Sequence, residues 1–205
     1  MINRFISFEG IDGAGKTTQI ELLIKRLEKN NYKVKVFREP GGMDISENLR
    51  KIILNKSFDI SSNTEMLLFL AARSELVTKV IYPALEKGYY VICDRYIDST
   101  VAYQGFGRKI DIKIINDLNK FVTLGLLPTV TFYLDISVKT MILRKNKENN
   151  DRMENSGLKF FERVRSGYFD LELKNNRFVK IDASQNIKKI ETQIWSSLND
   201  FFKDL

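Results

Sequence analysis

A short glycine-rich run near the N-terminus carries residue types that bind phosphate. It reads GIDGAGKTT and comprises Gly10, Ile11, Asp12, Gly13, Ala14, Gly15, Lys16, Thr17 and Thr18. The run matches the pattern G-x-x-x-x-G-K-[ST], in which glycines let successive backbone N–H groups approach phosphate oxygens. The lysine then brings a positive charge to the β- and γ-phosphates, and the next hydroxyl ligates Mg²⁺. The sequence therefore predicts a site for a nucleoside triphosphate with Mg²⁺.

Three charged residues near predicted strand ends could complete this site. Arg38 and Asp94 directly follow two predicted strands, and ligands of open α/β sheets lie outside the carboxyl ends of strands. An arginine there can grip a phosphate with its planar fork, and Asp94 can hold hydrated Mg²⁺ or merely cap a helix. Asp12, inside the loop, can contact Mg²⁺ or an acceptor hydroxyl, or can be a turn carboxylate without a ligand.

A second wall is indicated by residues 64–73 and 99–107. Phe69 and Arg73 are four residues apart on a predicted helix, so they share one face. A ring and a guanidinium on one face can stack on a base and bond its edge, although Phe69 taken alone is first of all a core candidate. The stretch STVAYQGFG, residues 99–107, offers hydroxyls, an amide and what we expect to be flexible backbone near the same rim.

The segment 144–157 is rich in charge and lacks apolar periodicity. We expect an exposed, mobile loop that acts as a lid, with a merely solvated loop as the alternative. Its positive residues are Arg144, Lys145, Lys147 and Arg152.

Short apolar runs alternate with helical patterns, which is typical of a mostly parallel sheet flanked by helices. We expect one α/β domain over residues 1–205 with five strands, and the fully apolar third strand should be central. The predicted strands are 5–8, 33–37, 89–93, 130–134 and 178–181. The predicted helices are 16–29, 46–54, 64–86 with a bend at Pro83, a pattern ending at 121, one starting at 138, 158–173 and 187–202.

Composition excludes several classes of protein. The chain has 205 residues and a formal charge of +7, but its basic residues are spread out, so we expect no nucleic-acid partner. It has no histidine, which excludes histidine chemistry, and one cysteine, which excludes an intrachain disulfide. No apolar run is long enough for a membrane helix and no leader is apparent, so we expect a cytoplasmic protein without a membrane partner. GTPases recognise guanine with the motif Asn-Lys-x-Asp. No Asn-Lys pair of this chain is followed by the rest of that motif, which counts against a GTPase.

The motifs, taken in their order, closely resemble those of bacterial thymidylate kinases over essentially the whole chain. The matching segments are FEGIDGAGKTT, REPGG, LFLAAR, DRYIDSTVAYQG, YLD and the DR ahead of FFERVRSGY. The resemblance implies a three-layer P-loop kinase fold and phosphoryl transfer from ATP-Mg²⁺ to dTMP, with a homodimer as the assembly. A kinase with a different nucleoside or nucleotide acceptor, or a binding protein that uses ATP as a switch, are the alternatives.

The resemblance also implies roles for individual residues. Arg38 and Arg95 would bind the acceptor phosphate, with Arg38 also near the γ-phosphate. Phe69 would stack on thymine, Arg73 would donate to a thymine carbonyl, and Tyr103 would pack below the deoxyribose. The remaining base contacts would come from Ser99, Thr100 and Gln104, and Asp12 would meet the 3′-hydroxyl or the metal region.

The catalytic cation of the family lies either in the loop or in the lid. Here the residue after Asp12 is Gly13 rather than arginine, so the resemblance implies that the catalytic cation comes from the lid. Arg152 is the first expectation, and Arg144 is the second, with stacking on adenine as another role.

Overall fold

The computed structural model describes residues 4–144, 152–153 and 156–202. The expected lid therefore falls largely outside the described residues, apart from Arg144, Arg152, Met153, Ser156 and Gly157. None of the described helices is both long and apolar enough to cross a membrane.

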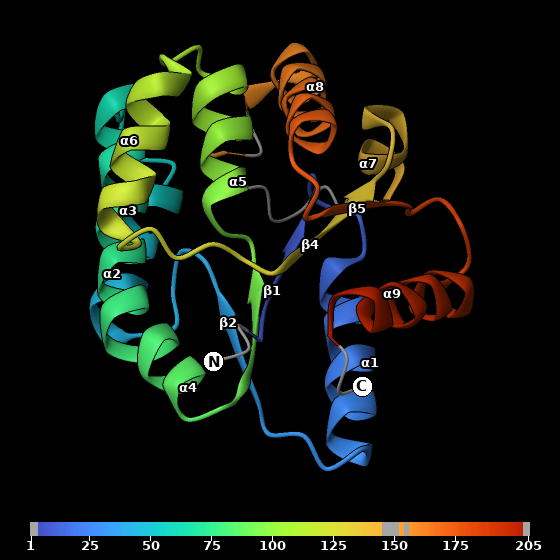
Figure 1. Ribbon diagram of the computed structural model, residues 1–205. Helices are drawn as coiled ribbons and strands as arrows, with labels where there is room; N and C mark the ends of the chain where they lie inside the picture. The colour runs from blue at the N-terminus through green and yellow to red at the C-terminus, as the bar shows by residue number, and fades with distance from the viewer. Residues whose placement is uncertain (1–3, 145–151, 154–155, 203–205) are drawn as a thin grey trace.

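A parallel sheet of five strands forms the centre of the structure (Figure 1). The strands are β1 (Phe5–Glu9), β2 (Val34–Arg38), β3 (Tyr90–Asp94), β4 (Val130–Asp135) and β5 (Phe178–Asp182), in the order β2-β3-β1-β4-β5. All four pairings are parallel, so the carboxyl ends of the strands share one edge. The expected class and strand set are confirmed, but the middle strand is β1, with β3 beside it. Both strands read as buried apolar runs, so hydrophobicity could not rank them.

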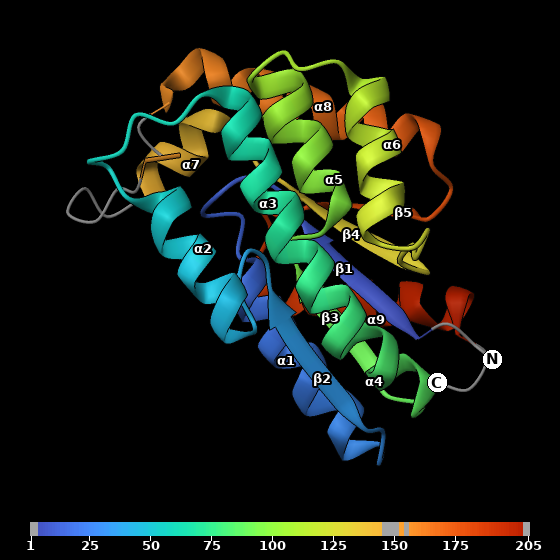
Figure 2. The ribbon, with the colours of Figure 1, turned by 90° about the vertical axis from the view of Figure 1, so that its left-hand side faces the viewer.

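Helices cover both faces of the sheet. The helices α1 (Lys16–Lys29) and α9 (Ile187–Phe201) lie on one side (Figures 1 and 2). The other side carries α2 (Asp44–Leu54), α3 (Ser62–Leu76), α4 (Tyr82–Glu86), α5 (Ile97–Thr100) and α6 (Ile112–Val122). The helices α7 (Val138–Arg144) and α8 (Leu158–Lys174) follow β4, and α8 packs along the continuation of α5.

The predicted helix 64–86 is present, with a π-helical segment inside it. This segment, η1 (Val77–Ile81), joins α3 to α4 without a break in the chain's helical course. Pro83 lies in the first turn of α4, where its missing N–H is tolerated, so it does not end the helix.

The expectation of flexible backbone at 99–107 is wrong. These residues continue α5 as a second π-helical segment, η2 (Val101–Gly107), which is almost entirely buried. Gly107 allows close packing: a Cβ there would lie 2.5 Å from Phe160. Gly107 therefore serves the packing of α8 on η2, and Gly105 faces Ile112 and Ile115 of α6, roles that the sequence alone does not distinguish from a loop.

Candidate active site

The predicted phosphate loop connects β1 to α1. Gly10, Gly13 and Gly15 have φ of 136°, 74° and 88°, a region that favours glycine. At Gly10 a Cβ would lie 2.4 Å from the Leu134 carbonyl oxygen, so only glycine fits. The side chain of Lys16 is buried, and its Nζ donates to the Gly10 carbonyl at 3.3 Å. Burial, followed by the charge of Arg95, lowers the pKa of Lys16.

Thr17 and Asp94 meet at the mouth of this loop. The Thr17 hydroxyl lies 3.5 Å from Asp94 Oδ2, which brings two of the predicted Mg²⁺ residues together. No cluster of three or more acidic, cysteine or histidine side chains suited to a metal exists in the described part of the chain. One hydroxyl and one carboxylate beside a phosphate loop nevertheless fit Mg²⁺, because this ion keeps several waters and phosphate oxygens as ligands.

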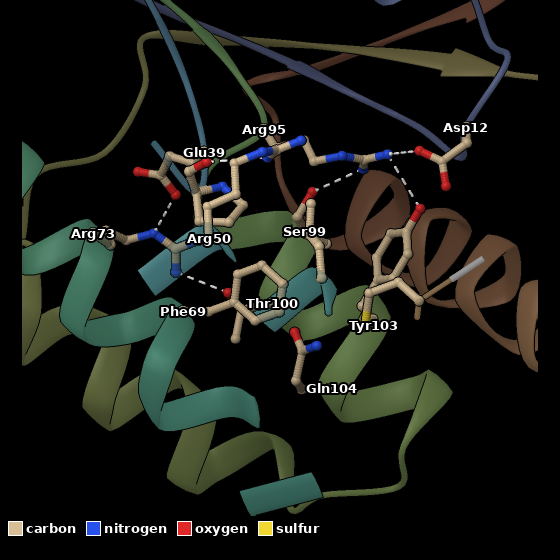
Figure 3. Close-up of a pocket in the computed structure, with 13 residues that line it drawn as sticks. Asp12, Glu39, Arg50, Phe69, Arg73, Arg95, Ser99, Thr100, Tyr103 and Gln104 are labelled. Carbon is tan, nitrogen blue, oxygen red and sulfur yellow. Dashed lines mark hydrogen bonds and ion pairs between the residues drawn. The ribbon is translucent and has the colours of Figure 1, made fainter. Parts of the chain in front are cut away.

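Arg95 occupies the junction between the loop and the second wall. Its backbone has φ of 73°, uncommon for a residue other than glycine. Its Nη2 lies 2.7 Å from Asp12 Oδ1 and 3.2 Å from the Tyr103 hydroxyl, while Nη1 donates to the Gly10 carbonyl at 2.9 Å (Figure 3). The guanidinium therefore contacts both the phosphate loop and the wall formed by η2.

The second wall is a polar pocket beneath this guanidinium. Phe69, Arg73, Ser99, Thr100, Tyr103 and Gln104 all line it, as Figure 3 shows. Arg73 is 2% exposed, with Nε 2.7 Å from Glu39 Oε2 and Nη1 donating to Thr100 at 2.8 Å and to Asn119 at 2.7 Å. Its Nη2 donates to the Tyr96 carbonyl at 3.0 Å, so one of its five N–H groups is left for a ligand.

Two residues expected to contact a base are engaged with protein groups. Ser99 Oγ lies 2.6 Å from Glu9 Oε2 and 3.2 Å from Arg95 Nη1. Gln104 donates through Nε2 to Glu65 at 2.9 Å, which leaves its carbonyl oxygen as the group that can face a ligand.

Arg38 and Arg50 lie on the rim between the loop and the pocket. Arg38 ends β2 with a half-exposed side chain, which ion-pairs with Glu47 at 3.4 Å. Arg50 of α2 donates to the Pro40 carbonyl at 3.0 Å and lines both cavities. No motif marks Arg50 in the sequence; it reaches the rim only because α2 follows β2 there.

The two expected lid arginines lie in different places. Arg144, the last residue of α7, donates to the Gly13 and Ala183 carbonyls, each at 3.1 Å. Arg152 lies 2.7 Å from Glu65 Oε2 and donates to the Ile53 carbonyl at 2.8 Å. Arg144 is thus brought to the phosphate loop, whereas Arg152 is brought to α2 and α3. Arg152 is also mostly buried, at 14% side-chain exposure, which differs from the exposed loop expected there.

Sequence reasoning missed several residues around both cavities. Glu9, the last residue of β1, and Tyr168 of α8 bond to each other and surround Arg95. A charged residue at the carboxyl end of an apolar strand was the available signal for Glu9, as it was for Asp94. Glu39 also lines the second wall and lies within the REPGG segment, which was its signal. The further lining residues, which carried no signal, are Leu54 and Met153 at the second wall and Ala183 and Gln185 beside the phosphate loop.

Comparison with known proteins bears on the whole chain. The family model described as Thymidylate kinase matches residues 8–194. The thymidylate kinase of Chlorobium limicola is 46% identical over 208 residues, covering 96% of this chain and 95% of the relative. That of Chlorobaculum parvum is 44% identical over 204 residues, covering 94% of each chain. The crystal structure of thymidylate kinase from Ehrlichia chaffeensis has a TM-score of 0.79 at 38% identity, covering 96% of this chain and 98% of that one. The chain is therefore an enzyme that belongs to the thymidylate kinase family.

Proposed function

We propose that this enzyme transfers the γ-phosphoryl group of ATP to dTMP, giving ADP and dTDP, with the donor at the phosphate loop and the acceptor against η2. The observation that carries this proposal is the shared boundary of the two cavities. Asp12, Glu39, Arg50 and Arg95 line both of them. A donor in one cavity and an acceptor in the other would therefore meet at these four residues. A nucleotide switch needs no second cavity of this kind.

The acceptor cavity suits a small base with polar edges. Phe69 offers a ring for stacking, while one N–H of Arg73 and the carbonyl oxygen of Gln104 are available for its edge. Ser99 and Thr100 lie in the same wall, and Tyr103 places its ring where a sugar would join base and phosphate. Arg95, with Arg38 on the rim, would bind the acceptor phosphate.

Phosphoryl transfer needs alignment and charge compensation more than covalent catalysis. An acceptor phosphate oxygen is already anionic near neutral pH, so no strong base is required, which agrees with the absence of histidine. Two polyanions must come together, and Lys16, Arg38 and Arg95 supply positive charge between them. Thr17, Asp94 and the Asp12 region would hold Mg²⁺, which compensates charge on the β- and γ-phosphates.

The further cation at the donor phosphates is better supported as Arg144 than as Arg152. Arg144 contacts the phosphate loop directly at Gly13. Arg144 also lines the cavity formed by Gln19, Ala183 and Gln185, where the donor base would bind. Arg152 is committed to Glu65 instead.

A homodimer in the cytoplasm remains part of the proposal. Helices α3 and α6 pack together and expose large apolar side chains, among them Leu67 at 53%, Ile114 at 51% and Phe121 at 76%. Apolar surface of this kind favours an interface. Light scattering after size exclusion should give twice the chain mass of 23.9 kDa, and Phe121→Asp should shift it toward the monomer.

Calorimetric titration of two variants tests the assignment of the two cavities. Arg95→Ala should weaken dTMP binding at least about 10-fold and leave Mg²⁺-free ATP binding within about 3-fold, because it removes a charge-assisted contact to the acceptor phosphate. Lys16→Ala should do the reverse. Loss of both ligands in both variants, or the opposite pattern, would refute the assignment.

A further inference from the structure

Glu9 is a fully buried carboxylate that lies behind Arg95, on the side away from Asp12. Its Oε1 accepts the Tyr96 backbone N–H at 2.7 Å. Its Oε2 accepts from the Ser99 hydroxyl at 2.6 Å and from the Tyr168 hydroxyl at 2.9 Å. Both hydroxyls in turn lie beside Arg95 Nη1, at 3.2 Å for Ser99 and 3.3 Å for Tyr168. Two hydroxyls thus stand between one carboxylate and one guanidinium, and neither charged group contacts the other directly.

This arrangement fixes the direction of both hydroxyl protons. A carboxylate only accepts hydrogen bonds and a guanidinium only donates them. Each hydroxyl therefore gives its one proton to Glu9 and turns a lone pair toward Arg95. Without the carboxylate, one hydroxyl can donate to the other instead, since the two oxygens are only 2.9 Å apart. The hydroxyl contacts of Arg95 Nη1 would then no longer be oriented, and this nitrogen would keep only the Gly10 carbonyl as a fixed acceptor, while Nη2 keeps Asp12.

We propose that Glu9 is a positioning residue for Arg95 in phosphoryl transfer, acting through the hydroxyls of Ser99 and Tyr168. The proposal rests on the proposed role of Arg95 as a ligand of the acceptor phosphate. Glu9 orients the two hydroxyls that hold Arg95 Nη1, while Asp12 holds Nη2. It touches no reacting atom, so its contribution is orientation.

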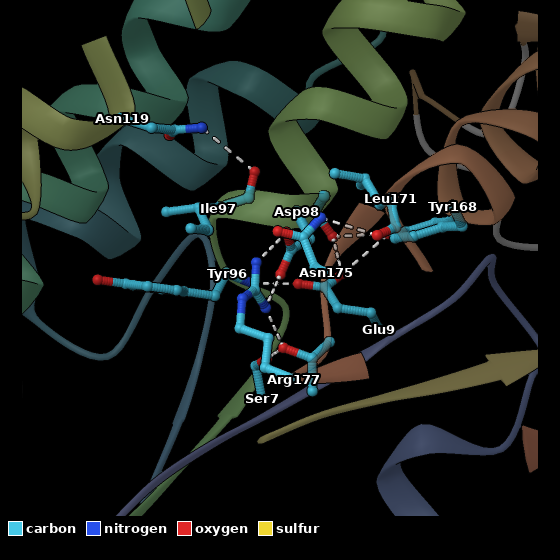
Figure 4. Close-up of polar contacts among 12 residues, drawn as sticks. Ser7, Glu9, Tyr96, Ile97, Asp98, Asn119, Tyr168, Leu171, Asn175 and Arg177 are labelled. Carbon is cyan, nitrogen blue, oxygen red and sulfur yellow. Dashed lines mark hydrogen bonds and ion pairs between the residues drawn. The ribbon is translucent and has the colours of Figure 1, made fainter. Parts of the chain in front are cut away.

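A second buried pair, Asp98 and Arg177, holds the helix that bears Ser99 beside the strand that ends in Glu9. Asp98, next to Ser99 in α5, is 2% exposed and accepts from Arg177 Nη2 at 2.6 Å and Nη1 at 2.8 Å (Figure 4). Arg177 also bonds to Thr131 of β4, whose hydroxyl lies 2.7 Å from Ser7 of β1. The pair therefore ties the first turn of α5 to the same strand that ends in Glu9. It also gives the buried carboxylate of Asp98 a bidentate partner of opposite charge, which offsets part of the cost of burying it near Glu9.

Glu9→Gln isolates the proton direction from the shape of the side chain. The glutamine oxygen must face the Tyr96 N–H, so its amide nitrogen would face Ser99 and Tyr168 and donate to them. Their protons would then have to turn away from residue 9, toward each other or toward Arg95, which would weaken the two hydroxyl contacts of Arg95 Nη1. At pH 8, kcat/KM for dTMP should fall at least about 10-fold while KM for ATP stays within about 2-fold.

A matched control removes a similar carboxylate from the neighbouring strand. Asp135 ends β4 as Glu9 ends β1, and it accepts from a tyrosine hydroxyl, that of Tyr133, at 2.9 Å. Asp135 makes an ion pair with Arg165 and lines neither cavity. Asp135→Asn should therefore leave both kinetic parameters within about 2-fold of wild type.

A mutant cycle decides whether Glu9 acts through the hydroxyls. Ser99→Ala combined with Tyr168→Phe should lower kcat/KM for dTMP about as much as Glu9→Gln does. Adding Glu9→Gln to that pair should then change it by less than about 2-fold, because the groups through which it acts are absent. If Glu9 instead acts only by holding the Tyr96 N–H, the fold-losses in kcat/KM for dTMP should multiply when the variants are combined. Such independent effects would overturn the proposal, as would a Glu9→Gln variant with unchanged kcat/KM for dTMP.

Two further measurements keep the test decisive. If Glu9→Gln fails to fold by near-ultraviolet dichroism, Tyr168→Phe alone should still lower kcat/KM for dTMP with KM for ATP unchanged, and no loss would overturn the proposal. Arg95→Ala is measured alongside. If it leaves dTMP kinetics unchanged, the proposed role of Arg95 fails; if it impairs them while the cycle is additive, only the role of Glu9 fails.

Discussion

Arg95 Nη2 and Asp12 Oδ1 lie 2.7 Å apart, which joins the rim of β3 to the loop that follows β1. Arg95 reaches this position from a left-handed backbone conformation, with φ of 73°. Such a conformation costs about 1 kcal/mol or more in a residue other than glycine, and it persists where surrounding contacts impose it. Both residues line both cavities, so the pair would couple the proposed donor site to the proposed acceptor site.

Loss of the Asp12 charge should impair the reaction more than binding. Asp12→Asn keeps the size of the side chain but removes the ion pair and a candidate Mg²⁺ contact. We expect kcat to fall at least about 10-fold and the Mg²⁺ concentration for half-maximal rate to rise, with dTMP affinity within about 3-fold. Initial rates over a Mg²⁺ titration measure this. An unchanged kcat and Mg²⁺ requirement would remove Asp12 from the metal and reaction centre.

The two arginines at the ends of the expected lid should respond differently to truncation. Arg144→Ala removes a cation from the phosphate loop, so kcat/KM for ATP should fall about 10-fold or more. Arg152→Ala leaves the buried Glu65 with its remaining partners Gln104 and Arg108, so it should lower thermal stability and affect ATP kinetics less than about 3-fold. Steady-state kinetics and melting temperatures of both variants test this prediction. A larger loss of kcat/KM for ATP in Arg152→Ala than in Arg144→Ala would instead support Arg152 as the catalytic cation.

Tyr103 should select against a ribose. Its ring lines the acceptor cavity and is packed against Phe160 and Phe161, so it cannot move away easily. Tyr103→Ala should reduce the preference for dTMP over its ribonucleotide counterpart at least about 5-fold by opening space below the sugar. Tyr103→Phe is the control, since it keeps the ring and removes only the hydroxyl. Equal discrimination by the alanine variant would exclude a sugar-wall role.

The buried pair of Arg177 and Asp98 should be important for stability. Arg177→Ala would leave Asp98, at 2% exposure, as a buried charge without its bidentate partner. Loss of one partner of such a pair typically costs about 3–5 kcal/mol of unfolding free energy. Lys174→Ala is the control, because its ion pair with Asp170 lies on the surface of α8, with 68% of the lysine side chain exposed, and should contribute less than about 1 kcal/mol. Urea unfolding gives both values; equal small losses would contradict the importance of the buried pair.

Glu9 should also impose a pH dependence on stability. Burial, and next the charge of Asp98, raise the pKa of Glu9 from 4.5 to about 7 in the folded protein. Between these values the folded state holds a proton that the unfolded state has lost, so this contribution to stability falls as pH rises from about 4.5 to about 7. The unfolding free energy of Glu9→Gln minus that of wild type should therefore increase across this window. A difference that does not change with pH would show that the pKa of Glu9 is not raised.

The elements and the donor site could be predicted from sequence because their signals are local. Apolar runs predicted all the strands, within one residue at each end, and the glycine and lysine spacing predicted the loop between β1 and α1 that we propose to bind phosphate. Resemblance to a family supplied residues of the acceptor wall, and the structure brings Phe69, Arg73, Tyr103 and Gln104 to one cavity.

The remaining parts depend on contacts between distant segments. Tyr168 and Glu9 are 159 residues apart, and nothing near either residue indicates that they bond. Residues 99–107 were expected to be flexible because glycines favour turns. Instead, Gly107 makes room for Phe160 of α8 in a packed π-helical segment, and Gly167 of α8 makes room for Phe106. The position of Arg152 also differs from the sequence-based expectation. It depends on an ion pair with the buried Glu65, which is distant in sequence, rather than on the residues that flank Arg152 in the chain.

The acceptor preference tests the central claim most directly. Initial rates of ADP formation from ATP-Mg²⁺ should be measured with dTMP, dUMP, dCMP, dGMP and AMP as acceptors, with the Lys16→Ala variant as the inactive control. We predict that kcat/KM for dTMP exceeds that for every other acceptor by at least about 10-fold. Equal rates across the panel, or ADP formation independent of any acceptor, would contradict the account.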